Sequence, residues 1–222
     1  MLSYDEMYHE VLKLQAEDEI HNLISDYCFE HNMALQMRYY AHWSRREDIR
    51  HEMPWGNTTG HAHLEYNNPW ADRVRHPHDA RVLPAGSLFI HLITTPVIEV
   101  AEDLQSARCV FLSPGIEASA VRAREGKDMG AWAYSKYAFE LIREDGQWKI
   151  WHSRIFPVFR NDYFKDFAKA PEADLTATKF RDGLEDFHAF FRYTPDCVMP
   201  RSEPEIPLPY DTWEPGWNFG VD

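Results

Sequence analysis

A histidine in an apolar strand is the first residue whose type and position could do chemistry. His91 lies in the segment SLFIHLITT, where strand alternation places Phe89, His91 and Ile93 on one face. The opposite face is also apolar, so the imidazole has little water around it. A free imidazole titrates near roughly pH 6.5, which makes His91 a candidate proton acceptor at neutral pH. The alternative is a core histidine held by structural hydrogen bonds.

An arginine in a second apolar strand is the next candidate. Arg154 lies in HSRIF, and a guanidinium keeps its charge wherever it is buried. It therefore needs an anionic or carbonyl partner. Such a cation could stabilise an oxyanion or a phenolate that develops during a reaction. The alternative is an internal ion pair with one of the 36 acidic residues.

Three polar residues on a predicted helix form the third candidate group. Tyr27 and His31 are four residues apart and share a helix face, and Asn32 flanks that face. A phenol and an imidazole on an otherwise apolar face could hydrogen-bond a substrate hydroxyl. The alternative places Tyr27 in the core and His31 at a solvated edge.

Two H-x-H pairs suggest a metal site only weakly. Residues two apart on a helix do not face together, which argues against His61 and His63, and no third carboxylate stands at ligand spacing near His76 and His78. The three cysteines form no C-x-x-C pair, and the sequence contains no G-x-S-x-G, P-loop or G-x-G-x-x-G motif. We therefore expect no metal and no cofactor.

Helices followed by hairpin-linked strands must position these residues. Apolar residues recur at three and four between residues 7 and 43, which predicts two or three helices. A short helix and a Pro-rich loop are expected over 61–85. Strands are predicted at 87–103 with a break at Pro96, and at 106–119, 131–144 and 147–159. Asp145-Gly146 predicts a two-residue type I′ turn, and the order of elements implies an α+β fold with an antiparallel sheet.

The C-terminal part of the chain differs in composition from the rest. Residues 1–168 are predicted to form the α+β domain, and residues 169–222 a Pro-rich extension. One short amphipathic piece is expected at 161–170, where the two meet, and another at 184–191 within the extension. The extension carries Trp213, Trp217 and Phe219. We therefore expect it to pack on the domain or on a neighbouring subunit.

Composition restricts the kind of partner. The formal charge of −13 repels phosphate backbones and anionic lipid, so no nucleic acid and no membrane is expected as partner. Aromatic residues make up 14% of the 222 residues, which favours a small hydrophobic or aromatic substrate. The sequence shows no signal-peptide pattern and no long apolar run, so we expect a cytoplasmic protein.

Four short motifs together resemble the nuclear-transport-factor-two-like and SnoaL-like superfamily, over roughly residues 8–168. They are I-x-x-L-I-x-x-Y ending at Tyr27, H-x-x-x-T-P starting at His91, D-G-Q-W starting at Asp145, and R-I-F starting at Arg154. The resemblance implies a cone-shaped α+β barrel, with N-terminal helices packed on a curved, mostly antiparallel sheet. The superfamily includes scytalone dehydratase and bile acid 7α-dehydratase, and related lyases that release formaldehyde from lignin-derived diaryl compounds.

The resemblance also implies roles for single residues. In the dehydratases a strand histidine is the base, a helix tyrosine and aspartate orient substrate and histidine, and a late arginine assists. These roles fall on His91, Tyr27 and Arg154, but the aspartate position is Asn32. An amide cannot stabilise an imidazolium as a carboxylate does. Either His31 or another acid substitutes, or the chemistry differs from simple dehydration.

These observations predict a cofactor-independent lyase of the dehydratase or aldehyde-lyase type. It would eliminate water or formaldehyde from a hydrophobic aromatic or polycyclic hydroxylated substrate, and the residues expected to contact that substrate are His31, Asn32, Phe89, Trp132 and Tyr134. The alternatives are a ligand-binding protein, a subunit like the small subunit of ring-hydroxylating oxygenases, or an isomerase or cyclase of the same fold. We expect a homo-oligomer, as a trimer rather than a dimer.

Overall fold

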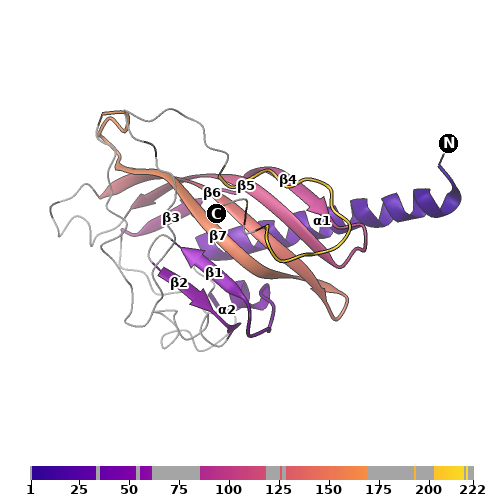
Figure 1. Ribbon diagram of the computed structural model, residues 1–222. Coiled ribbons are helices and arrows are strands. Elements are labelled where there is room, and N and C mark those ends of the chain that lie inside the picture. Colours follow the sequence, from indigo (N-terminus) through magenta and orange to yellow (C-terminus); the bar gives the residue numbers. More distant parts are fainter. Residues whose placement is uncertain are drawn as a thin grey trace.

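Helices on one side and a curved sheet on the other make up the structure (Figure 1). The computed structural model describes residues 2–33, 36–53, 56–61, 86–118, 126, 129–169, 193, 203–217 and 219. The short helix and Pro-rich loop predicted over 61–85 lie outside the described residues except for His61. The same holds for the other three paired histidines and for the amphipathic piece at 184–191.

Two helices precede the sheet, as the apolar period predicted. Helix α1 spans Tyr4–Asn32 and helix α2 spans Gln36–Ala41. A capping box fixes the start of α1: Ser3 Oγ accepts the Glu6 N–H at 3.2 Å, and the Glu6 carboxylate accepts the Ser3 N–H at 2.6 Å. No helix within the described ranges is long and apolar enough to cross a membrane.

Seven strands of the described residues form one sheet. Their bounds are β1 Arg50–Met53, β2 Gly56–Thr59, β3 Leu88–His91, β4 Thr94–Val100, β5 Ser106–Ala118, β6 Gly130–Glu144 and β7 Gln147–Asp162. The strand order is β2-β1-β7-β6-β5-β3, and β4 also pairs with β5. Only the β1–β7 pair among these is parallel. The α+β class with a mostly antiparallel sheet is confirmed, and in the described part the sheet stays open, because β2 and β3 are its edges.

The hairpin between β6 and β7 has the predicted turn. A type I′ turn needs positive φ at both central residues, and φ is 50° at Asp145 and 76° at Gly146. Strand β7 continues to Asp162 and is followed by turns up to Lys169, where the sequence predicted a short amphipathic piece. These two long strands form the centre of the sheet.

The break before β4 lies earlier than predicted. The chain leaves the sheet at Leu92 and Ile93, whereas Pro96 lies inside β4. The register of β4 against β5 shifts between Thr94 and Val97, and such a bulge tolerates a proline that has no N–H to donate. Strand β3 therefore ends at His91.

The two faces of the sheet have different coverings. On the inner face, Phe111 and Phe139 belong to the same core cluster as Ile20, Ile24 and Tyr27 of α1, which packs against this face. On the outer face, Val110, Ala138 and Phe156 form a second cluster with Phe219. Each face is a set of alternate strand residues, so the face of a residue decides which cluster it joins.

The C-terminal segment 203–217 follows the outer face (Figure 1). Its backbone joins the β4–β5 connection, because the Glu102 N–H donates to the Tyr210 carbonyl at 3.0 Å. Trp213 Nε1 donates to Glu140 of β6 at 2.9 Å, and Lys136 Nζ donates to the Glu203 carbonyl at 2.7 Å. These contacts fix the segment on the side of the sheet away from α1.

Candidate functional site

His91 ends the edge strand β3, and α1 holds its backbone there. The His91 N–H donates to Asn32 Oδ1 at 2.9 Å, and Asn32 Nδ2 donates to the His91 carbonyl at 3.1 Å. Cys28 Sγ donates to the same carbonyl at 3.0 Å. An edge strand leaves such groups without a neighbouring strand, so α1 takes its place. An aspartate could not donate to the carbonyl, which explains why an amide suits position 32.

The ring of His91 reaches a carboxylate on the inner face. His91 Nε2 lies 3.1 Å from Glu117 Oε1 of β5, and Glu117 Oε2 accepts a hydrogen bond from Arg160 of β7. Gly115 makes room for the ring, since a Cβ at that position would lie 2.6 Å from His91 Cδ2. A cation, a carboxylate and an imidazole thus form a row across the sheet.

The charge of Glu117 determines which nitrogen of His91 carries the proton. Burial raises the pKa of Glu117, but the hydrogen bond from His91 and the charge of Arg160 outweigh it and lower the pKa to about 2. An ionised carboxylate only accepts, so Nε2 carries the proton of the neutral ring. The other nitrogen, Nδ1, is buried and has no hydrogen-bond partner among the described residues. His91 therefore holds a lone pair on Nδ1 that no internal donor occupies in this part of the chain.

A pair of phenols lies on the same side of the sheet. Tyr27 Oη and Tyr39 Oη of α2 are 2.9 Å apart, and the two rings stack with centroids 4.5 Å apart. Burial first, then the neighbouring tyrosines, raises the pKa of Tyr27 well above its usual range, and burial raises the pKa of Tyr39 to about 12. Both phenols keep their protons at neutral pH. One hydroxyl proton forms the hydrogen bond between the two phenols, and the other hydroxyl proton can be donated to another oxygen.

Two further histidines approach this cluster. The His31 ring lies 5.4 Å from the His91 ring and 6.1 Å from the Tyr39 ring, centroid to centroid. His51 lies deeper, with Nδ1 2.6 Å from Ser153 Oγ. Burial, and secondarily the charge of His31, lowers the pKa of His51 to about 3, so His51 stays neutral.

Arg154 lies on the other face. It is 3% exposed, pairs with Glu52 of β1, and its guanidinium carbon is 5.2 Å from the centroid of the Phe219 ring in the outer cluster. Its partner across β6 is Ala138, which also belongs to the outer cluster. The structure does not bring Arg154 to His91, and it places this arginine in the internal ion pair that was the alternative.

The three aromatic residues predicted to contact substrate divide between the faces. Phe89 pairs in register with Glu117 and so shares the inner face with it. Trp132 stacks on Tyr163 at 5.0 Å, and Tyr134 stacks on Phe159 at 4.8 Å, between centroids. Both alternate with inner-face residues of β6 and therefore point outward. The predicted residues that lie together are Tyr27, His31, Asn32, Phe89 and His91.

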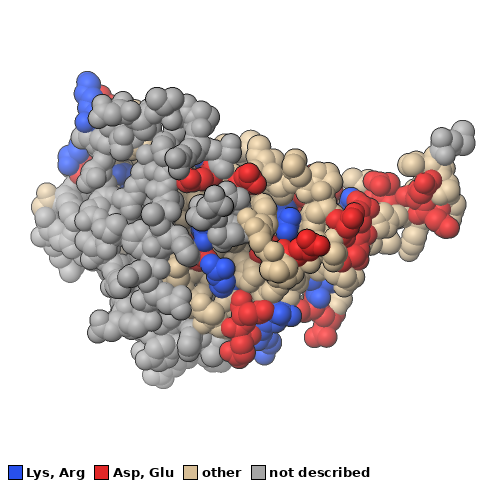
Figure 2. All heavy atoms as spheres, in the orientation of Figure 1, with Lys and Arg blue, Asp and Glu red and all other residues tan. Residues whose placement is uncertain are grey.

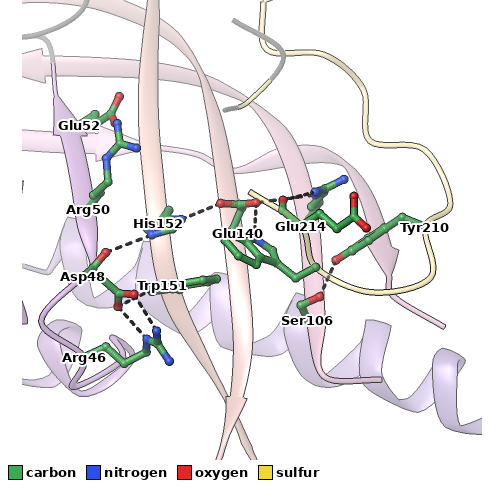
Figure 3. Close-up of polar contacts among 12 residues, drawn as sticks. Arg46, Asp48, Arg50, Glu52, Ser106, Glu140, Trp151, His152, Tyr210 and Glu214 are labelled. Carbon is green, nitrogen blue, oxygen red and sulfur yellow. Dashed lines mark hydrogen bonds and ion pairs between the residues drawn. The ribbon is translucent and has the colours of Figure 1, made fainter. Parts of the chain in front are cut away.

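A second histidine–carboxylate pair occupies the outer face (Figure 3). His152 Nδ1 lies 2.6 Å from Glu140 Oε2, and His152 Nε2 lies 3.1 Å from the Asp48 carbonyl. Glu140 also accepts from Trp213, so the C-terminal segment takes part in this network. Both ring nitrogens of His152 have hydrogen-bond partners, whereas Nδ1 of His91 has no hydrogen-bond partner in the described chain.

Sequence reasoning missed three of the polar residues that lie with His91 and Tyr27 on the inner face: Glu117, Arg160 and Tyr39. The signal for Glu117 was available, because it is an acid two residues after a glycine in an apolar strand. Arg160 and Tyr39 gave no signal, since neither stands in a pattern that predicts its face. Within the described residues, no group of three or more His, Cys, Asp or Glu side chains is placed to hold a metal ion.

The helices cover the inner face of an open, mostly antiparallel sheet, and that face carries the candidate site. The SnoaL-like domain family matches residues 13–154, more than half of the chain, so the chain belongs to this family. The resemblance seen in the sequence is thereby confirmed. No protein of curated function matches the sequence significantly.

Solved structures support the same fold. A protein of Novosphingobium aromaticivorans provisionally assigned as a scytalone dehydratase matches with a TM-score of 0.54 and 16% identity, over 71% of this chain and 93% of that one. Hexachlorocyclohexane dehydrochlorinase LinA-type3 of Novosphingobium barchaimii matches with a TM-score of 0.53 and 17% identity, over 71% and 96%. At these identities the similarity establishes the fold alone.

Proposed function

We propose that this protein is a cofactor-independent lyase in which His91 is the general base. The supporting observation is the pair of His91 and Glu117, which leaves Nδ1 of the ring without a partner in the described chain. A carboxylate on Nε2 fixes the tautomer that presents Nδ1 as the acceptor, and its negative charge lies beside the imidazolium that forms when Nδ1 takes a proton. Glu117 thus supplies the negative charge that Asn32 lacks.

The reaction class follows from these groups. Nδ1 removes a proton from the substrate, and the electron pair left behind forms the new double bond as a C–O bond breaks. The leaving oxygen takes a proton from the tyrosine pair or from the imidazolium and departs as water. In formaldehyde release, Nδ1 takes the proton of a hydroxymethyl O–H, the C=O bond of formaldehyde forms as the C–C bond breaks, and the carbon that keeps the electron pair of that bond takes the proton back from the imidazolium. Arg154, on the outer face, has no part in this proposal.

The tyrosine pair suits the developing negative charge on oxygen. Tyr27 and Tyr39 are protonated donors in an apolar environment, where a hydrogen bond to an oxyanion is stronger than in water. The surrounding inner-face side chains are largely aromatic, for example Phe139, whose ring meets Tyr27 edge-on at 5.7 Å between centroids. An aromatic or polycyclic hydroxylated substrate fits such surroundings.

Product mass tests the proposal. The protein, treated with chelator, is incubated with hydroxysteroids, hydroxylated polyketides and lignin-type diaryl diols beside its His91→Ala variant. We expect one compound to lose the mass of water or formaldehyde with the wild-type protein and to stay unchanged with the variant. A product of unchanged mass would instead make the protein an isomerase or cyclase. If no compound reacts but one binds, the protein is a ligand-binding member of the family.

A further inference from the structure

The first three turns of α1 carry an apolar stripe that nothing in the described chain covers. The exposed fractions are 76% for Tyr4, 48% for Met7, 57% for Tyr8, 56% for Val11 and 62% for Leu14. This part of α1 extends beyond the sheet (Figure 1). Single exposed apolar side chains are ordinary on a surface, but a contiguous row marks an interaction surface.

The stripe lies on the side of the helix opposite to the core. Ala16, Ile20 and Ile24 are at most 1% exposed and face the sheet. Leu14 and Ala16 are two residues apart, which is about 200° around a helix. The stripe is therefore not the edge of the core-facing surface, and the packing of α1 on its own sheet does not account for it.

The spacing is that of a helix–helix seam. Tyr4, Met7, Val11 and Leu14 follow each other at three, four and three residues, the a and d positions of two heptads. The next a position is Asp18, which ends the seam. The capping box at Ser3 and Glu6 begins the helix immediately before the seam. The helix is thus ordered over the whole stripe.

We propose that this stripe pairs with the same stripe of a second copy of the chain, as two parallel helices, which gives a dimer in place of the trimer expected from the sequence. Because the stripe faces away from the sheet, the two domains lie on opposite outer sides of the helix pair and do not collide. Acidic side chains gather on this protruding part of α1 (Figure 2), including Asp5, Glu6 and Glu10. The direction of pairing must therefore keep acidic residues apart.

Charge favours the parallel direction. One flank of the seam, the g positions, holds Glu10 and Glu17, and the other flank, the e positions, holds Tyr8 and Gln15. Parallel helices place g beside e, so Glu10 meets Gln15 of the second copy. Antiparallel helices place g beside g and would bring glutamates together at a cost.

The size of the seam determines how strongly the copies associate. Two heptads bury less than the roughly 1,200 Å² in total that stable interfaces need at minimum. The pair is therefore concentration-dependent, and since the flanking charges repel, it strengthens as salt screens them. This association is independent of the chemistry at His91.

Sedimentation equilibrium of the full chain over a wide range of concentration tests the pairing. We expect the average mass to rise towards that of a dimer, and Val11→Glu to weaken association at least tenfold. Phe29→Glu is the matched control, because Phe29 is 68% exposed on the same helix but lies beyond the seam. Circular dichroism of both variants verifies that α1 still forms. A wild-type chain that stays monomeric, or an oligomer that Val11→Glu leaves unchanged, would overturn the proposal.

Cysteine cross-linking tests the direction. In parallel helices equivalent positions face each other, so Tyr4→Cys alone and Leu14→Cys alone each form a disulfide-linked dimer under mild oxidation. In antiparallel helices residue 4 faces residue 14, and only a mixture of the two variants would cross-link. The unsubstituted chain, which has its own cysteines, is the control. Cross-linking in the mixture alone would refute the parallel arrangement.

Discussion

The buried His51, near the candidate site, predicts how the free energy of unfolding depends on pH. His51 is 4% exposed, its ring meets the Trp43 ring at 5.0 Å between centroids, and burial lowers its pKa to about 3. In the unfolded chain the same imidazole titrates near roughly 6.5. Below about pH 6.5 the imidazole therefore binds a proton in the unfolded state but not in the folded state.

The sign and the magnitude follow from this difference. The contribution is fully present above pH 6.5 and is lost as the pH falls towards 3, by about 1.4 kcal/mol for each pH unit. Between pH 7.5 and pH 5.0 the loss occurs only below the unfolded-state pKa, over about 1.5 pH units. The free energy of unfolding therefore falls by about 2 kcal/mol because of His51.

Urea unfolding at pH 7.5 and pH 5.0 measures this loss. We compare wild type with His51→Gln, which removes the titrating ring, and with His21→Gln, which removes an exposed histidine of α1. The pH-dependent loss should be about 2 kcal/mol smaller in His51→Gln than in wild type. It should be the same in His21→Gln as in wild type. An equal loss in all three proteins would refute the inference that His51 is buried in its neutral form.

Three further predictions concern the row of residues on the inner face. Histidine ¹⁵N spectra at neutral pH, assigned with His91→Gln, should show a protonated Nε2 and an unprotonated Nδ1 for His91; the opposite tautomer would mean that Glu117 does not accept from this ring. Gly115→Ala should lower the free energy of unfolding by more than about 1 kcal/mol in urea, because its Cβ would lie 2.6 Å from His91 Cδ2 and 2.9 Å from two backbone oxygens; unchanged stability would contradict this packing. Glu117→Gln should lower kcat by about 10²-fold with little change in KM, since it removes the charge that stabilises the imidazolium; a change in KM alone would give Glu117 a binding role.

Much of the fold could be predicted because its signals are local. The Asp145-Gly146 turn, the two helices and the long strands each follow from residue types within a few positions of one another. The family and the α+β class were predicted correctly for the same reason. The bend before β4 was misplaced, because Pro96 is compatible with a bulge as well as with a break, and only the pairing with β5 distinguishes them.

The candidate site was predictable in part, because faces depend on register. Arg154 and Arg160 are six residues apart in β7 and would share a face in a regular strand. The pairing with β6 shifts between Tyr134 and Ser135, where Val158 is the extra residue, and this reverses the face. Arg154 consequently lies outward and Arg160 inward. No local pattern in the sequence shows where such a bulge falls.

The most direct test of the central claim compares two histidines of the same chain. His91 and His152 each pair with a glutamate, but His91 lies on the inner face with Nδ1 unpartnered in the described chain, whereas both nitrogens of His152 are engaged on the outer face. On the substrate found by product mass, we would measure kcat/KM for wild type, His91→Gln and His152→Gln, after verifying that both variants fold. We predict a loss of about 10²-fold or more for His91→Gln and less than about tenfold for His152→Gln. Activity retained in His91→Gln, or lost equally in both variants, would contradict the assignment of His91 as the base.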